Sequence, residues 1–245
     1  MAQSQQYEPL AAAQGVDQRF DQGVGAVIAR MRALAADLPP GDGVAVFNRV
    51  YLAVTEAVDR AIDSGAAGGF PDRTAAVTLD VRFAERYLTA VDAASAGLLL
   101  GPACWRPLLQ FRRHPGVRPL QFALAGINAH IGHDLALAVV DACHTLGCEP
   151  AFLEDEFERV GDILVTLEER IREELMPGPD LLQIADPLTH LLGSWSLERA
   201  RDAAWGAARA LWALRELPGV TAEFTRSMDT SVGLVGRMLL TPLPD

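Results

Sequence analysis

The sequence contains no lysine, so all 21 of its basic residues are arginines. This absence excludes reactions in which a lysine forms a Schiff base with a carbonyl substrate or with pyridoxal phosphate. It also excludes nucleotide binding by a P-loop, which requires a lysine that contacts the phosphates. Because a composition rich in alanine and arginine is typical of genomic codon bias, we do not interpret the arginines as a functional signal.

Cysteine is also scarce, and Cys104, Cys143 and Cys148 form no CxxC pair. Their spacing predicts neither a disulfide framework nor a zinc finger, and it is typical of a reducing environment. The first 22 residues carry no apolar segment of the kind found in signal peptides. We therefore expect a cytoplasmic protein.

Positive charge is in deficit, since the formal net charge is −11. This balance disfavours binding to a phosphate backbone and docking on an anionic membrane surface. We therefore expect a small-molecule ligand or substrate as the partner, and neither nucleic acid nor a membrane. The sequence leaves the oligomeric state open.

Alternating strand patterns and internal repeats are absent, whereas apolar residues recur at helical spacing along most of the chain. With 245 residues, 50% of them hydrophobic, the chain is long enough for one large core. We predict an all-α, single-domain bundle of eight or nine helices over residues 21–245, after a flexible segment at 1–20. The predicted helices lie at about 24–34, 46–62, 79–94, 105–111, 119–146, 157–175, 181–192, 196–215 and 221–240, and 119–146 is the buried central helix.

The longest apolar run, from Leu120 to Cys143, contains His130, His133 and Asp134. On a helix these three residues fall within an arc of roughly 100°. The run is long enough to cross a membrane, but its ionisable residues would be costly in lipid, so we predict a buried helix of a soluble protein. Buried titratable groups are costly unless they are paired, neutral or metal-bound, which makes this segment the best candidate for chemistry.

Three interpretations of these residues stay open: a structural polar network, a metal-free acid–base or substrate-binding site, and a metal site. One helical turn cannot easily supply three ligands, so a metal would need a second helix. The sequence has no HExxH motif. We therefore expect no cofactor, with a divalent metal held by His130, Asp134 and His190 as the alternative. Further acidic candidates are Asp80, Glu85, Glu56 and Asp186.

The same run contains two further clues. Asn128 lies about 160° from His130 around an ideal helix, so it is expected to contact a different helix. Gly126 lies on the His130 side, where a ligand or another backbone could approach closely.

Outside the central helix, Asp80 stands near the predicted start of a helix, which favours a capping role. Asp80 also shares a face with Phe83 and Tyr87, and the three could instead form the wall of a pocket. Tyr51 lies on a similar polar and aromatic face of the preceding helix.

Arg201 and Trp205 are four residues apart and could form a cation–π pair. The simplest interpretation is core packing with an arginine rim. A clamp for an anionic substrate is the alternative.

Several segments resemble a bacterial family of uncharacterised helical proteins. These are Phe47–Tyr51, Leu79–Tyr87, Gly126–Leu135 and Ala200–Trp205, and the resemblance spans most of residues 24–240. The segment Asn-Ala-His-Ile-x-x-Asp-Leu is its most specific part. The resemblance implies no settled activity. It does imply that the position of His133 varies, which favours His130 and Asp134 as the essential groups.

We hypothesise an enzyme that acts on a small, largely apolar molecule held between helices, by cyclisation or hydrolysis in specialised metabolism. His130, Asp134 and Asp80 would be the acid–base groups, because a histidine with a pKa near neutrality suits proton transfer. A metal-dependent hydrolase or oxygenase is one alternative, and a non-enzymatic binding or interaction protein is another. The residues expected to bind the substrate are Tyr51, Tyr87, Trp105, His133 and Arg201.

Overall fold

The computed structural model describes residues 10–64, 69–97, 101–175 and 196–242, with side chains omitted for 10–22 and 168–175. Within these ranges the chain contains no strand, so the predicted all-α class is confirmed. The described residues form eight helices when Pro119–Leu146 is counted as one. The predicted helix at 181–192, which carries Asp186 and His190, lies outside the described residues.

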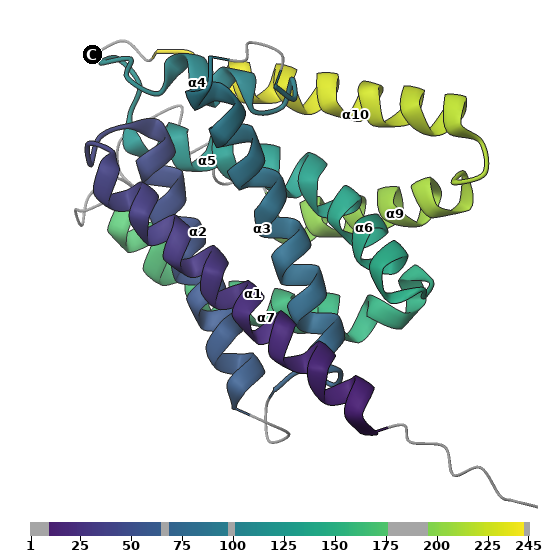
Figure 1. Cartoon of the computed structure of the whole chain (residues 1–245). Helices are drawn as coiled ribbons and strands as arrows, with labels where there is room; N and C mark the ends of the chain where they lie inside the picture. The colour runs from purple at the N-terminus through teal and green to yellow at the C-terminus, as the bar shows by residue number, and fades with distance from the viewer. Residues whose placement is uncertain (1–9, 65–68, 98–100, 176–195, 243–245) are drawn as a thin grey trace, which may run out of the picture.

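Short connections join several consecutive helices, including the first two (Figure 1). The first begins within the segment predicted to be flexible, and the proposed division at residue 20 stays a prediction. The elements are α1 (Leu10–Asp37), α2 (Gly43–Asp63), α3 (Arg73–Ser95), α4 (Arg106–Phe111), α5 (Pro119–Ala129), the π-helical turn η1 (His130–Asp134), α6 (Leu135–Leu146), the 3-10 turn η2 (Pro150–Leu153), α7 (Glu154–Leu175), α9 (Leu197–Ala213) and α10 (Pro218–Leu239).

Side-chain caps determine where three helices begin. Asp42, Asp72 and Ser196 each accept a hydrogen bond from a backbone N–H in the first turn of α2, α3 and α9. Ser196 thus stands at the start of the helix that was predicted at 196–215. The prediction that Asp80 caps a helix is wrong, because α3 begins at Arg73 and Asp80 lies buried in its interior.

The helix from Pro119 to Leu146 is the core of the bundle. It is long and apolar enough to cross a membrane, but 78% of its most apolar window is buried inside the protein. The prediction of a buried central helix is confirmed. Gly147, at φ +65°, ends this helix in the left-handed conformation that favours glycine.

Helix α10 lies across α4 and α5 (Figure 1) and is attached by side-chain amides of the central helix. Gln121 donates to the carbonyls of Leu239 and Thr241, each at 2.8 Å. Asn128 donates to the carbonyl of Val232 at 3.0 Å, which confirms that Asn128 contacts a different helix. These bonds fix the face of α10 that is turned toward the central helix.

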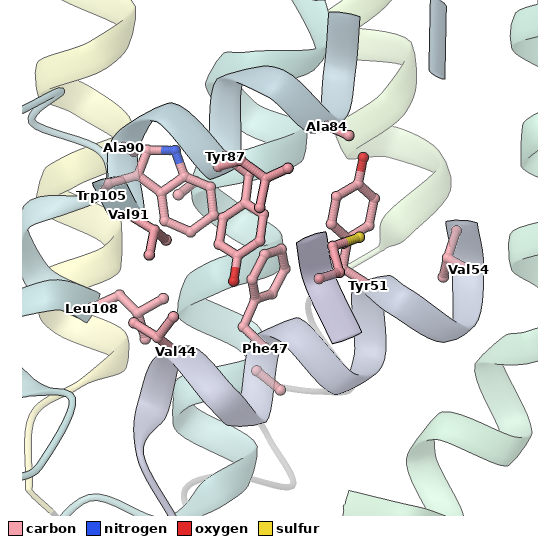
Figure 2. Packing of buried hydrophobic residues seen from close by; sticks show 14 of the residues in the cluster. Val44, Phe47, Tyr51, Val54, Ala84, Tyr87, Ala90, Val91, Trp105 and Leu108 are labelled. Carbon is pink, nitrogen blue, oxygen red and sulfur yellow. The ribbon is translucent and has the colours of Figure 1, made fainter. Parts of the chain in front are cut away.

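The close approach at Gly126 comes from a side chain and not from a ligand. A Cβ built at Gly126 would lie 2.3 Å from Cδ2 of Phe47, well inside van der Waals contact. Phe47 is buried in α2 and packs against the rings of Tyr51, Tyr87 and Trp105 (Figure 2). The glycine therefore lets α2 and its aromatic ring dock directly on the central helix.

We expect Gly126→Ala to lower the free energy of unfolding by about 1–3 kcal/mol, because the new methyl group overpacks the Phe47 ring. The midpoint of urea unfolding measures this change. Gly206→Ala is the matched control, since a Cβ at Gly206 on α9 meets nothing within 4 Å. The control is expected to be neutral or slightly stabilising, and equal effects at both positions would contradict the steric explanation.

Candidate active site

The central helix changes its winding at the residues that the sequence singles out. Residues His130–Asp134 form a π-helical turn, in which the N–H of Leu135 donates to the carbonyl of His130, five residues back. The expectation of a regular α-helix through 119–146 is therefore wrong at this point. Single π-turns within α-helices are frequent at functional sites, because they reorient side chains relative to the regular helix.

Asp134 is the centre of a buried polar cluster. Its Oδ2 atom lies 3.1 Å from Nδ1 of His130 and accepts a hydrogen bond of 2.8 Å from the indole N–H of Trp105. Its Oδ1 atom lies 2.9 Å from Nδ1 of His133. Burial acts to raise the pKa of Asp134, but the hydrogen bonds from both histidines outweigh it, and the pKa is lowered. Asp134 is thus an ionised carboxylate that accepts from three N–H donors.

His130 is held as a neutral base. Burial lowers the pKa of His130, and the attraction of Asp134 only partly opposes this. Because the ionised Asp134 can only accept, the proton of the neutral ring lies on Nδ1 and the lone pair on Nε2. Nε2 is buried and has no hydrogen-bond partner among the described residues.

Aromatic side chains from α2, α3 and the segment before α4 enclose the His130 ring. Phe83 stacks on its face, with ring centroids 3.6 Å apart and planes at 6°. Tyr51 packs edge-on at 4.3 Å. Phe47, Tyr87 and Trp105 complete the enclosure at 5.8 to 6.2 Å, and Figure 2 shows these three rings packed together, with Tyr51 beside them. The structure thus brings the predicted residues Tyr51, Tyr87 and Trp105 to His130.

Two more buried polar atoms lack a partner in the described part of the chain: Oη of Tyr51, whose ring packs on His130, and Oδ2 of Asp80, whose charge acts on Tyr51. The nearby hydroxyl of Thr55 donates to the backbone carbonyl of Tyr51. Burial, with a contribution from Asp59, raises the pKa of Asp80 to about 7. Burial and the charge of Asp80 raise the pKa of Tyr51 well above its usual value. By contrast, the hydroxyl of Tyr87 donates to Asn48 at 3.2 Å and has its hydrogen bond within the protein.

His133 points to the other side of Asp134. It and Asp134 contribute to the lining of a groove of about 950 Å³ between α3 and α6. Charged side chains of both helices line the groove, and the ion pair between Arg86 of α3 and Asp141 of α6 joins its two sides. His130 is not among the lining residues. The two histidines therefore share one carboxylate but face different surroundings.

The cation–π contact of Arg201 is made with Phe157 and not with Trp205. Arg201 lies over the ring of Phe157 at 4.5 Å and donates to the backbone carbonyl of the same residue on α7. Both contacts of the guanidinium hold α9 against α7. No hydrogen bond, ion pair or ring contact in the described ranges joins it to the His130 cluster, and a role in substrate binding stays a prediction.

Two residues that no sequence pattern placed near the cluster, Cys104 and Asp229, lie beside His133. Both carboxylate oxygens of Asp229 accept backbone N–H groups, from Cys104 and Ala103, each at 2.9 Å. Oδ1 of Asp229 lies 3.8 Å from Nε2 of His133. Only the docking of α10 reveals this proximity, because Asp229 lies 125 positions after Cys104 and 96 positions after His133 in the sequence.

The fold and the cluster together define an all-helical bundle with a buried His–Asp–His unit on a π-turn of its central helix. The chain belongs to DUF5995, a family of unknown function, whose model matches residues 24–242. This finding confirms the resemblance to an uncharacterised helical family. No curated protein and no solved structure matches the chain.

Proposed function

We propose that this protein is an enzyme that moves protons on a small, largely apolar molecule bound in the aromatic enclosure around His130. One observation carries the proposal: Nε2 of His130, Oη of Tyr51 and Oδ2 of Asp80 are buried without hydrogen-bond partners in the described structure. Unsatisfied buried polar groups are rare because each costs about 1–3 kcal/mol. A polar group of a bound molecule would satisfy them.

His130 and Asp80 are suited to opposite tasks, since one can accept a proton and the other can donate one. His130 is neutral and carries a free lone pair, so it can accept a proton, and Asp134 would stabilise the resulting imidazolium. Asp80, with its pKa raised to about 7, holds a proton on a substantial fraction of molecules at neutral pH and can donate it. Environments that hold one group as base and another as acid are typical of acid–base enzymes. A cyclisation or isomerisation needs this combination, because one proton enters as another leaves.

Phe83 provides the means of access. Its ring is only partly buried and covers the face of the His130 imidazole. Rotation of this ring away from His130 would open a space bordered by apolar side chains and by the three unsatisfied polar atoms. A substrate held there would be shielded from water, which strengthens its interactions with the polar groups.

The metal-dependent alternative with His130, Asp134 and His190 has less support. Three N–H groups already occupy the carboxylate of Asp134, and Nδ1 of His130 is one of these donors. His190 lies outside the described residues. The non-enzymatic alternative uses the same enclosure, and it differs from our proposal in predicting binding without turnover.

The test begins with the protonation state of His130. At pH 7, ¹⁵N nuclear magnetic resonance is expected to report a neutral ring with the proton on Nδ1. Deuterium uptake from heavy water into a library of small ketones, epoxides and polyenes then measures proton transfer. His130→Gln is expected to lower uptake by about 100-fold or more, whereas Tyr87→Phe, whose hydroxyl bonds to Asn48, should retain it.

A charged His130 at pH 7, or a proton on Nε2, would remove the base and overturn the proposal. Equal uptake by the wild type and His130→Gln would do the same. Binding of library members to the wild type without any deuterium uptake would favour the non-enzymatic alternative.

A further inference from the structure

Cys104, His133 and Asp229 bring three kinds of metal ligand together beside the groove. The ligand atoms of the thiol, the imidazole and the carboxylate all lie within 4.8 Å of one another. Cys104 precedes α4, His133 lies on the π-turn and Asp229 on α10. We propose that these residues form a Zn²⁺ site, which is separate from the role proposed for His130 and does not depend on it.

The distances suit a tetrahedral ion. Bonds of about 2.0–2.3 Å from Zn²⁺ to nitrogen, oxygen and sulfur place neighbouring ligands about 3.3–3.8 Å apart. Nε2 of His133 and Oδ1 of Asp229 are 3.8 Å apart, which exceeds a hydrogen bond but fits two ligands of one ion. Because the three ligand atoms all lie within 4.8 Å of one another, the side chains need to move together only slightly to bind one ion.

The imidazole of His133 is oriented for this task. Its Nδ1 atom pairs with Oδ1 of Asp134 at 2.9 Å, so in the neutral ring the lone pair of Nε2 points toward Asp229. The side chain is only 5% exposed, and its Nε2 atom has no partner within hydrogen-bond distance in the described ranges. A carboxylate that binds the second nitrogen of a histidine ligand is a common feature of zinc sites, because it fixes the tautomer and the ring orientation.

Asp229 and Cys104 are fixed relative to each other. The backbone N–H of Cys104 donates to Oδ1 of Asp229, and that of Ala103 donates to Oδ2. Each carboxylate oxygen keeps a further lone pair for a metal, since an ionised carboxylate has about four acceptor positions. The ligand set is therefore largely preorganised before an ion binds.

The charge at this place favours a cation. The carboxylates of Asp134 and Asp229 both lie close enough to Cys104 to act on its thiol electrostatically. No arginine of the described chain forms an ion pair with either carboxylate. A divalent ion would balance this negative charge. On binding, a Zn–S bond replaces the S–H bond, and the proton is released to solvent.

The site has three protein ligands, and the fourth position would face the groove. His133 lines this groove, together with Arg82 and Arg86 of α3. Zinc sites with three protein ligands keep the remaining position for water or a ligand. The groove, which His133 lines but Cys104 and Asp229 do not, is the side from which a small polar or anionic molecule would reach the ion through this position.

Zinc titration of the full-length protein, freed of metal by dialysis against a chelator, tests the proposal. One equivalent of Zn²⁺ is expected to bind, measured by competition with a chromophoric chelator and by elemental analysis. Cys104→Ser and Asp229→Asn should each weaken binding by about 100-fold or more, because each removes or weakens a direct ligand. Co²⁺ is expected to give a thiolate charge-transfer band that Cys104→Ser abolishes.

Cys143→Ser and His144→Gln are the matched controls, because both residues lie on α6 outside the cluster. They should bind Zn²⁺ like the wild type. Circular dichroism of the metal-free variants checks that each is folded, and Cys104→Ser, which changes one atom, is the decisive variant. Failure of the wild type to bind one equivalent, or unchanged affinity in Cys104→Ser, overturns the site. His130→Gln should still bind Zn²⁺, so failure of this proposal is distinguishable from failure of the proposed function.

Discussion

Replacing Asp134 with alanine is expected to lower the free energy of unfolding by about 3–5 kcal/mol. The substitution removes the acceptor for three buried donors, the Nδ1–H groups of His130 and His133 and the indole N–H of Trp105. His130 and Trp105 lie in the core, where water cannot easily replace the lost bonds. The cost of leaving these donors unpaired adds to the cost of the cavity.

Urea unfolding at pH 7 measures this effect. Asp141→Ala is the matched control, because Asp141 lies on α6, seven residues further along, and forms a partly exposed ion pair with Arg86. Such pairs contribute about 1 kcal/mol or less. If the two variants differ by less than about 1 kcal/mol, Asp134 is not the centre of the cluster.

Asp80→Asn is expected to have the opposite effect and to stabilise the protein above neutral pH. Burial, together with Asp59, raises the pKa of Asp80 from 3.8 to about 7. Between these values the unfolded chain loses its proton while the folded protein keeps it, so the free energy of unfolding falls as the pH rises. One pKa unit corresponds to about 1.4 kcal/mol. Removing the charge should therefore add roughly 2–4 kcal/mol at pH 8 and little at pH 4.

Unfolding of the wild type and Asp80→Asn at pH 4.5, 6 and 8 tests this expectation. His130 contributes in the opposite direction, since its lowered pKa makes the folded protein less stable as the pH falls below about 6.5. Comparing the two proteins at the same pH cancels this contribution. If the difference in the free energy of unfolding between the two proteins does not grow with pH, ionisation of Asp80 does not destabilise the folded protein. If Asp80 is the proton donor of the proposed enzyme, Asp80→Asn should also lose proton transfer. Active-site groups often lower the stability of the folded protein, so their removal stabilises it and abolishes activity.

The sequence predicted much of the local structure because the signals for helices are local. Apolar periodicity identified the helices, and the ranges predicted at 119–146 and 196–215 agree with the observed helices to within two residues at each end. The start of α3 was predicted six residues too late. The residue that caps α3 is Asp72. The first turn after it contains no large apolar residue, so apolar periodicity did not reveal the start of the helix. The π-turn at His130 was missed, since no residue preference distinguishes it from a regular helical turn.

Local signals in the sequence sufficed to predict that this chain forms helices and that His130, His133 and Asp134 lie together on a buried one, because backbone periodicity and the cost of burying charge act within a few residues. The groups that contact these three residues are known only from the packed helices. Three contacts depend on how the helices dock against one another. Phe83 stacks on His130, Arg201 packs on the ring of Phe157, and Cys104 and Asp229 approach His133. Docking is decided by the fit of side chains distant in the chain, and apolar patterns specify which face is buried but not what that face will contact.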